Sequence, residues 1–299
     1  MPAIFAMIAI SQQTTPIDPM RLPIGPRMEV QVPINKLTSL STRKEIKLED
    51  LAKEADGYSY LYLGENHATK AHQDLQAAII RALVARGRSV VVGLEMYTRP
   101  KQDWLDQWTA GKLSESEFLE KSDWKNQWGF PYDFYKPVFE AAKEHKLPMV
   151  ALNVPRDWVR QVGRNGISAL TTEQKLQLPV ELFLGNTAHK MVFDALIGGH
   201  PVSGQQGANI YAAQVLWDEG MADTAIKWMD RFGTQQTIFV VIAGAGHIMY
   251  NQGINFRVER RTKKPGLTLV MGQAGGATNV ARGLADYVFL SSGTSPAKR

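Results

Sequence analysis

Two glutamates and two histidines directly follow apolar runs of the kind that form buried strands. They are Glu65, His67, Glu95 and His247. Two carboxylates and two imidazoles in one cleft either bind a divalent cation or move protons to and from a bound water. Each residue alone also has a common structural role, since a glutamate caps a helix and a histidine packs as a satisfied polar group. Four such residues at strand ends favour a shared site.

The elements that must position these side chains are four apolar runs, typical of buried strands. They are Tyr58–Leu63, Ser89–Leu94, Leu147–Leu152 and the run that starts at Thr237 and breaks at Gly244. An amphipathic helix over Lys70–Arg86 lies between the first two runs, which predicts a right-handed βαβ unit and a parallel sheet. In open α/β sheets ligands sit at the carboxyl ends of the strands, so we expect the four side chains, together with Asn153 after the third run, to converge there.

The fold class that follows is α/β, with a mainly parallel central sheet flanked by helices and a smaller helical lobe. We expect residues 1–42 to be an extended arm or the remnant of a signal segment, residues 43–290 to form the α/β domain, and residues 291–299 to be a disordered tail. Helical excursions are expected at about 99–135 and 157–231. The tryptophans of the first excursion are more typical of a small core than of a cofactor site.

The composition excludes several classes of site. The chain has 299 residues, ordinary globular contents of 44% hydrophobic and 21% charged residues, and a net charge of +5. It has no cysteine, which excludes disulfides, zinc–thiolate sites, iron–sulfur clusters and thiol catalysis. No basic run or arm stands out, so nucleic acid is not an expected partner. The sequence contains no G-x-S-x-G elbow, Walker A motif or H-E-x-x-H motif.

Tyr250 lies three residues beyond His247 in a glycine-flanked segment, and we expect it to line the same cleft as the strand-end residues. A phenolate oxygen is one of the axial ligands that proteins supply to haem iron. The alternative is a tyrosine whose ring packs against the sheet and whose hydroxyl faces water. The spacing alone favours this alternative.

Two helical stripes offer further polar groups. Tyr211, Gln214 and Asp218 share one face of a helix expected over Gly207–Met229, where they either line the cleft or face solvent. Arg156, followed by arginines four and eight residues on, gives a cationic ridge able to meet carboxylates such as haem propionates. A solvated helix face is the more common explanation of such spacing.

Several segments together resemble the ChaN-like haem-binding proteins of the Tiki/erythromycin-esterase superfamily. The matching pieces are LGENH at 63–67, GLEM at 93–96, ALNVPR at 151–156, AAQVLWDEGMA at 212–222 and GAGHIMYNQGI at 244–254. The resemblance runs from about Tyr58 to Arg260. The order of the pieces is specific, whereas any one alone is weak.

The resemblance implies a haem-binding protein of the cell envelope, often a lipoprotein, with a role in haem or iron acquisition. It implies haem held at a homodimer interface through a tyrosine oxygen, and Tyr250 is the matching position. In the wider superfamily the roles of a metal or hydrolytic centre map onto Glu65, His67, Glu95 and His247, which keeps a metal-assisted or acid–base hydrolase as the alternative. Family lipoproteins carry an acylated cysteine that this chain lacks, so the resemblance leaves membrane association open and is compatible with a periplasmic protein.

Overall fold

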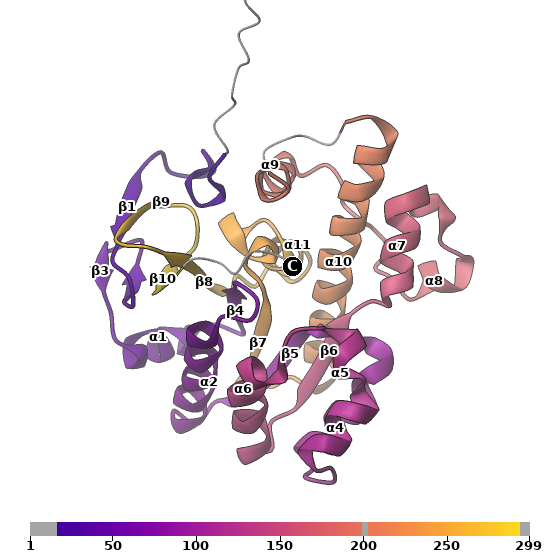
Figure 1. Cartoon of the computed structure of the whole chain (residues 1–299), viewed down its shortest axis with the longest axis horizontal. Coiled ribbons are helices and arrows are strands. Elements are labelled where there is room, and N and C mark those ends of the chain that lie inside the picture. The colour runs from indigo at the N-terminus through magenta and orange to yellow at the C-terminus, as the bar shows by residue number, and fades with distance from the viewer. Residues whose placement is uncertain (1–16, 199–202, 294–299) are drawn as a thin grey trace, which may run out of the picture.

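The protein is described by a computed structural model over residues 17–198 and 203–293. Its centre is an eight-stranded sheet in the order β3-β2-β10-β8-β4-β7-β5-β6 (Figure 1). The strands are β2 (Leu37–Ser39), β3 (Lys44–Glu45), β4 (Tyr60–Glu65), β5 (Ser89–Thr98), β6 (Met149–Asn153), β7 (Thr237–Gly244), β8 (Leu267–Ala274) and β10 (Tyr287–Ser292). All neighbours from β10 to β6 are parallel, and β2 and β3 add an antiparallel edge. The predicted α/β class with a mainly parallel sheet is confirmed.

The central strands are buried on both faces, as expected of parallel strands that helices cover. Along β4, Leu61 and Leu63 enter one core while Tyr60 and Tyr62 enter the other, because successive side chains of a strand point to opposite faces. Near-continuous apolar runs therefore form these strands rather than an alternating pattern.

Helices cover both faces of the sheet. The first core is covered by α1 (Leu48–Glu54), α2 (Lys70–Ala85) and α6 (Tyr132–Glu144). The second is covered by α9 (Thr187–Leu196), α10 (Gly204–Phe232) and α11 (Ile254–Thr262). Two short helices, α7 (Arg156–Asn165) and α8 (Thr172–Leu176), lie beyond α10 and form the smaller helical lobe (Figure 1).

The excursion after β5 holds α3 (Gln102–Thr109), α4 (Glu115–Ser122) and α5 (Trp124–Gln127). Trp108 and Trp124 are buried in the first core, where Trp124 packs against Tyr132 and Phe139. These tryptophans therefore belong to a small core. The fourth tryptophan of the excursion, Trp128, faces a cavity instead.

The ends of the chain are more ordered than the sequence suggests. Regular structure begins well before residue 43, with a short 3₁₀ turn at Pro19–Arg21 and β1 (Glu29–Val32), which pairs with β9 (Thr278–Ala281). At the other end, β10 extends to Ser292. The expectations of an arm up to residue 42 and a tail from residue 291 are corrected accordingly, and residues 1–16 and 294–299 lie outside the described residues. No helix in the described ranges is long and apolar enough to cross a membrane.

Candidate functional site

Four adjacent strands carry the predicted polar residues to one edge of the sheet. Glu65 is the last residue of β4, Asn153 is the last residue of β6, and Glu95 lies within the second half of β5. His247 follows β7 directly, in a short 3₁₀ turn. Because β4, β7, β5 and β6 are neighbours and parallel, these side chains meet as the sequence predicts.

The carboxylate of Glu65 is buried and receives four hydrogen bonds. Gln73 and Gln76 on α2 donate to Oε2 at 2.7 and 2.8 Å, and the Tyr135 hydroxyl donates to Oε1 at 2.9 Å. Nδ1 of His67 lies 3.1 Å from the same Oε1. Since the other three partners are donors, the carboxylate acts as acceptor throughout, and we assign the proton of His67 to Nδ1. Nε2 of His67 is then the ring nitrogen at which a proton can be gained or lost.

His67 is partly exposed and stands between aromatic rings and a glycine. Its ring centroid lies 4.6 Å from that of Trp128 and 5.6 Å from that of Phe130. On the other side, a Cβ at Gly244 would come within 2.9 Å of Cε1 and 3.0 Å of Nε2 of His67. Any residue larger than glycine at position 244 would therefore displace the imidazole. Burial would lower the pKa of His67, but the hydrogen bond to Glu65 and the charge of Glu95 raise it above the usual value.

His247 lies between two carboxylates. Its Nδ1 donates to Oδ1 of Asp218 on α10, and its Nε2 is 3.4 Å from Oε1 of Glu95. Burial would lower the pKa of His247, yet the charges of Glu95 and Asp218 raise it to about 10. Burial would raise the pKa of Glu95, but the imidazolium holds it at about 2, and the Gly244 N–H also donates to Oε2 at 2.6 Å. At neutral pH the group is therefore an ion pair.

A second layer stabilises Asp218 from behind. Nε2 of His189 on α9 lies 2.8 Å from Oδ2, and the Arg257 guanidinium lies 3.7 Å from the same oxygen. Nδ1 of His189 is in turn 3.0 Å from the hydroxyl of Tyr211. No periodicity in the sequence connects His189 with Asp218. The pair Gln73 and Gln76 did carry a signal, because two polar residues occupy the buried stripe of an amphipathic helix.

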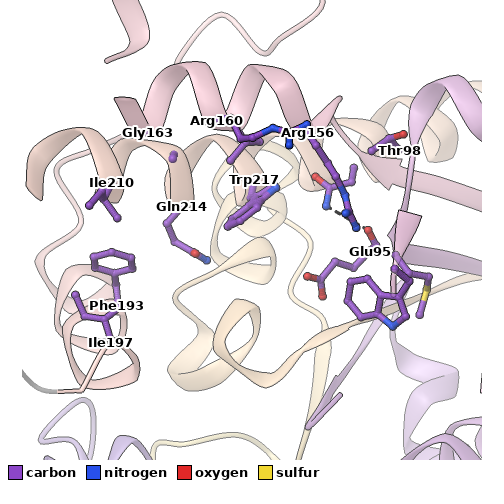
Figure 2. A pocket seen from close by; sticks show the side chains of 15 residues that line it. Glu95, Thr98, Arg156, Arg160, Gly163, Phe193, Ile197, Ile210, Gln214 and Trp217 are labelled. Carbon is purple, nitrogen blue, oxygen red and sulfur yellow. Dashed lines mark hydrogen bonds between the residues drawn. The ribbon is translucent and has the colours of Figure 1, made fainter. Parts of the chain in front are cut away.

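A cavity of about 660 Å³ opens beside this cluster. Figure 2 shows Glu95 and Arg156 at one end, Phe193, Ile197 and Ile210 at the other, and Trp217 between them. The remaining lining residues come from β5, the end of α5, β6, α7 and α10, and are Met96, Thr98, Trp128, Asn153, Val159, Arg160, Gly163, Ala213 and Gln214. The cavity is thus mainly apolar, with polar groups at the end nearest the strand tips, as is usual for small-molecule sites.

The structure places the predicted cofactor-binding residues on the cavity wall, behind that wall and, for Tyr250, outside the cavity. Gln214 and Arg156 line the cavity, and Gln214 also reaches Nδ1 of His247 at 3.1 Å. Asp218 and Tyr211 lie behind it, buried.

Tyr250 is not brought into this cavity. Its side chain is buried in the second core, its hydroxyl accepts from the Leu22 N–H at 2.7 Å, and it donates to the Pro19 carbonyl at 3.0 Å. Tyr250 and Asn251 both adopt left-handed backbone conformations, with φ of 58° and 57°. This turn directs the tyrosine toward the segment before β1, which corrects the expectation of a tyrosine that shares the cleft with the strand-end cluster.

The arrangement fits an acid–base or anion-binding role better than a metal centre. Within residues 17–198 and 203–293, no group of three or more His, Asp or Glu side chains is disposed to hold a metal ion. His247 is protonated between two acids and has no lone pair to offer, whereas His67 has a free ring nitrogen. The apolar walls fit a flat hydrophobic group such as haem, and Arg156 and Arg160 fit its carboxylates.

Comparison with known proteins gives one family and a set of similar folds. The family model described as haem-binding uptake, Tiki superfamily, ChaN matches residues 51–258. A solved structure described as cofacial haem binding to ChaN of Campylobacter jejuni aligns with a TM-score of 0.64 and 18% identity, covering 85% of this chain and 95% of that one.

Two further solved structures align more loosely. A mutant of the erythromycin esterase EreC in its open conformation gives 0.48 and 13%, covering 79% and 77% of the two chains. A type III effector gives 0.46 and 12%, covering 88% and 97%. No protein among the curated, characterised ones matches the chain.

Proposed function

This chain belongs to the ChaN family of haem-binding uptake proteins in the Tiki superfamily, and on that premise we propose that it binds haem in the cavity between β5, α7, α9 and α10. The observation that carries the proposal is the division of this cavity into apolar walls and one polar end, where Arg156 and Arg160 lie near Glu95, whose charge His247 balances. Bound haem would supply an iron centre for transport or for exchange of its axial ligand.

The chain's own residues would bind haem at three positions. The ring of Trp217 and the side chains of Phe193 and Ile210 would exclude water from the porphyrin faces, since flat apolar groups gain most from such walls. Arg156 and Arg160 would neutralise the propionates by charge-assisted hydrogen bonds. Arg156 is already held at the cavity's end, because it donates to the Asn126 carbonyl at 2.9 Å.

Haemin titration of the full chain tests this placement. We expect Arg156→Ala/Arg160→Ala to lower haemin affinity at least tenfold, because two charge-assisted contacts are lost. The matched double variant Lys112→Ala/Lys264→Ala removes two exposed charges outside the cavity and should bind as the wild type does. Equal affinity of both variants would place haem elsewhere.

Tyr250 as axial ligand is a separate proposal, because Tyr250 does not line this cavity: haem bound through its hydroxyl would lie beside Pro19 and Leu22 and not against Arg156. This hydroxyl is held by Leu22 and Pro19, and burial raises its pKa above the usual value, so ligation requires this N-terminal segment to move aside. The absorbance and electron paramagnetic resonance spectra of haemin-loaded wild type and Tyr250→Phe decide the matter. An unchanged high-spin ferric spectrum in the variant would show that another residue ligates the iron.

We also propose that haem joins two copies of the chain and that the protein works in the cell envelope in haem or iron acquisition. Both follow from the family and not from a contact in this chain. Sedimentation velocity with and without haemin tests the first, and fractionation of cells that express the full-length protein tests the second. If the chain stays monomeric when haemin is bound, the proposed dimer is wrong.

A second function, acid–base hydrolysis, is favoured by one observation: two histidines, each paired with a carboxylate, flank Glu95. In this scheme Nε2 of His67 would accept a proton from water while the His247 imidazolium donates one to the leaving group. The metal-assisted version has no support among the described residues.

Turnover of a panel of small esters and amides, measured with and without a chelator, tests the second function. We expect His67→Gln to lower the rate at least a hundredfold, because removing a positioned base has effects of that order. Glu140→Gln, on the exposed side of α6, is the control. If no substrate of the panel is turned over, the cluster has no hydrolytic role on these bonds.

A further inference from the structure

A second and larger cavity, of about 1030 Å³, lies on the outer edge of the sheet and shares no lining residue with the first. Its floor is the free side of β6, with Pro148, Val150 and Ala151. One wall is the last two turns of α10, and the other is formed by the start of α3 and the end of α8. None of the residues discussed for haem or for acid–base chemistry faces it.

The polar backbone along this edge is already satisfied by side chains. Gln102 donates from Nε2 to the Met149 carbonyl at 2.7 Å and accepts from the Ala151 N–H at 2.8 Å, as a neighbouring strand would. Thr224 donates to the Leu152 carbonyl at 2.9 Å. An extended peptide therefore finds little of the edge hydrogen bonding that strand addition depends on. A ligand of this cavity must be held by apolar contact and by charge.

The walls of this cavity carry apolar side chains that are exposed to solvent. Leu176 is 79% exposed and Phe232 is 55% exposed, and both line this cavity. Trp228 also lines the cavity, and its ring centroid lies 5.4 Å from that of Phe232. Apolar surface gathered around one concave site is more typical of a binding site than of ordinary surface.

The charged side chains of the cavity are mainly cationic. Lys227 and Arg231 lie one turn apart on α10, and Arg99 also lines the cavity, with its guanidinium donating to Thr224 and Gly220 of α10 and to Gln177. Asp106 is the acidic side chain of the described lining, and it already accepts from Nε2 of Gln102 at 2.8 Å. Lys227 is paired with Asp223, but its side chain is 63% exposed and free to turn. The site thus presents cations at the rim of an apolar trough.

We propose that this trough binds a single-chain amphiphile with an acidic head, a free long-chain fatty acid. The carboxylate would lie between Lys227 and Arg231, and the alkyl chain would run over Val150 and Trp228 to Leu176. This site is independent of haem, and it requires no movement of β6.

Calorimetric titration of the full chain with dodecanoate, tetradecanoate and hexadecanoate, each below its micelle concentration, tests the proposal. Affinity should rise roughly tenfold for every two methylene groups added, as burial of an alkyl chain requires. Quenching of Trp228 fluorescence, identified by its loss in Trp228→Phe, should follow the same isotherm. Binding that does not depend on chain length, or no binding at all, would overturn the proposal.

Charge-reversal variants locate the head group. Lys227→Glu/Arg231→Glu should weaken hexadecanoate binding at least tenfold, while Lys112→Glu/Lys264→Glu makes the same change of net charge on exposed positions away from the trough. Equal loss in both variants would show a general charge effect and contradict the site. If the chain instead sediments with anionic phosphatidylglycerol vesicles and does not bind free fatty acid, the trough is a membrane-facing surface and the proposal is wrong.

Discussion

The two histidine–carboxylate pairs on either side of Glu95 look alike in composition and differ in what surrounds them. Glu65, the partner of His67, is held mainly by neutral donors, and the imidazole is one-third exposed with a free Nε2. Asp218, the partner of His247, is held by charged or chargeable groups, and that imidazole lies buried between two acids. One histidine is poised for exchange with a ligand or solvent, and the other is fixed as an ion.

The difference shows that a histidine beside a carboxylate does not have one fixed role. Where neutral donors hold the carboxylate, as at Glu65, the partner histidine keeps a partly exposed ring nitrogen that can exchange its proton with solvent. A carboxylate shared with further cations, together with a second acid, holds its histidine charged. We therefore expect the first pair to supply the base in any chemistry of the site, and the second pair to contribute most to the stability of the fold.

The largest effect is expected for Asp218→Asn. The amide leaves His247 with one acid and leaves Arg257 buried beside a neutral group, and breaking a buried charge pair costs roughly 3–5 kcal/mol. Urea unfolding at pH 7 measures the loss. The control Asp157→Asn removes a carboxylate that is 84% exposed, and should stay within about 0.5 kcal/mol of the wild type. Similar losses in both would refute a special role for the buried pair.

The meeting of these residues at one edge was predictable from the sequence, because strand ends follow from apolar runs, whereas the contrast between the two pairs was not. Glu65, Glu95, Asn153 and His247 converge as predicted, since parallel strands place all their carboxyl ends at one edge. The detail of β5 was not readable: it continues to Thr98, with a register shift between Leu94 and Thr98. Such irregularities depend on tertiary contacts and leave no periodic signal.

The placement of Tyr250 was beyond sequence reasoning for another reason. Two consecutive residues other than glycine with positive φ are uncommon, so nothing predicts that the chain turns left-handed at Tyr250 and Asn251. The turn directs the hydroxyl to Leu22 and Pro19, which are more than two hundred residues away in the chain. Long-range backbone partners of this kind carry no spacing that a single sequence reveals.

The next effect in size is expected for Glu65→Gln. Each carboxylate oxygen accepts from two donors, so the new amide nitrogen faces either Gln73 and Gln76 or Tyr135 and His67. At least one buried hydrogen bond is lost, at about 1–3 kcal/mol. The pKa of His67 should fall at the same time, because its hydrogen bond to a carboxylate is gone. Urea unfolding and an NMR titration of the imidazole signals measure both. A variant in which His67 titrates unchanged would contradict the pairing.

The ion pair of His247 and Glu95 should give stability a defined pH window. The pKa of His247 is about 10 in the folded chain against an ordinary 6.5, so its contribution is complete below about pH 6.5 and is lost as pH rises toward 10. The pKa of Glu95 is about 2 against an ordinary 4.5, so its contribution is complete above about pH 4.5 and is lost as pH falls toward 2.

Unfolding free energies measured from pH 3 to pH 10 check this window. The slope above pH 6.5 should reach at most about 1.4 kcal/mol per pH unit for one proton. In Glu95→Gln the decline should still begin near pH 6.5, but it should end at a lower pH and be smaller, because one of the two acids that raise the pKa of His247 is gone. A wild-type profile that is flat between pH 7 and pH 10 would show that His247 is not held as an ion.

The smallest effect, and the most selective one, is expected for Gly244→Ala. The new Cβ would lie 2.9 Å from Cε1 of His67 and 3.6 Å from Oε2 of Glu95, so the imidazole must shift while the His247 pair keeps its place. Because His67 is partly exposed and the contact is with the end of its side chain, the loss should be about 1 kcal/mol, the low end for overpacking. The control Gly163→Ala meets Ala213 at an ordinary 3.6 Å on a helix and should stabilise slightly. NMR shifts confined to His67 would separate the mobile pair from the fixed one, whereas equal shifts at both histidines would show that they move as one unit.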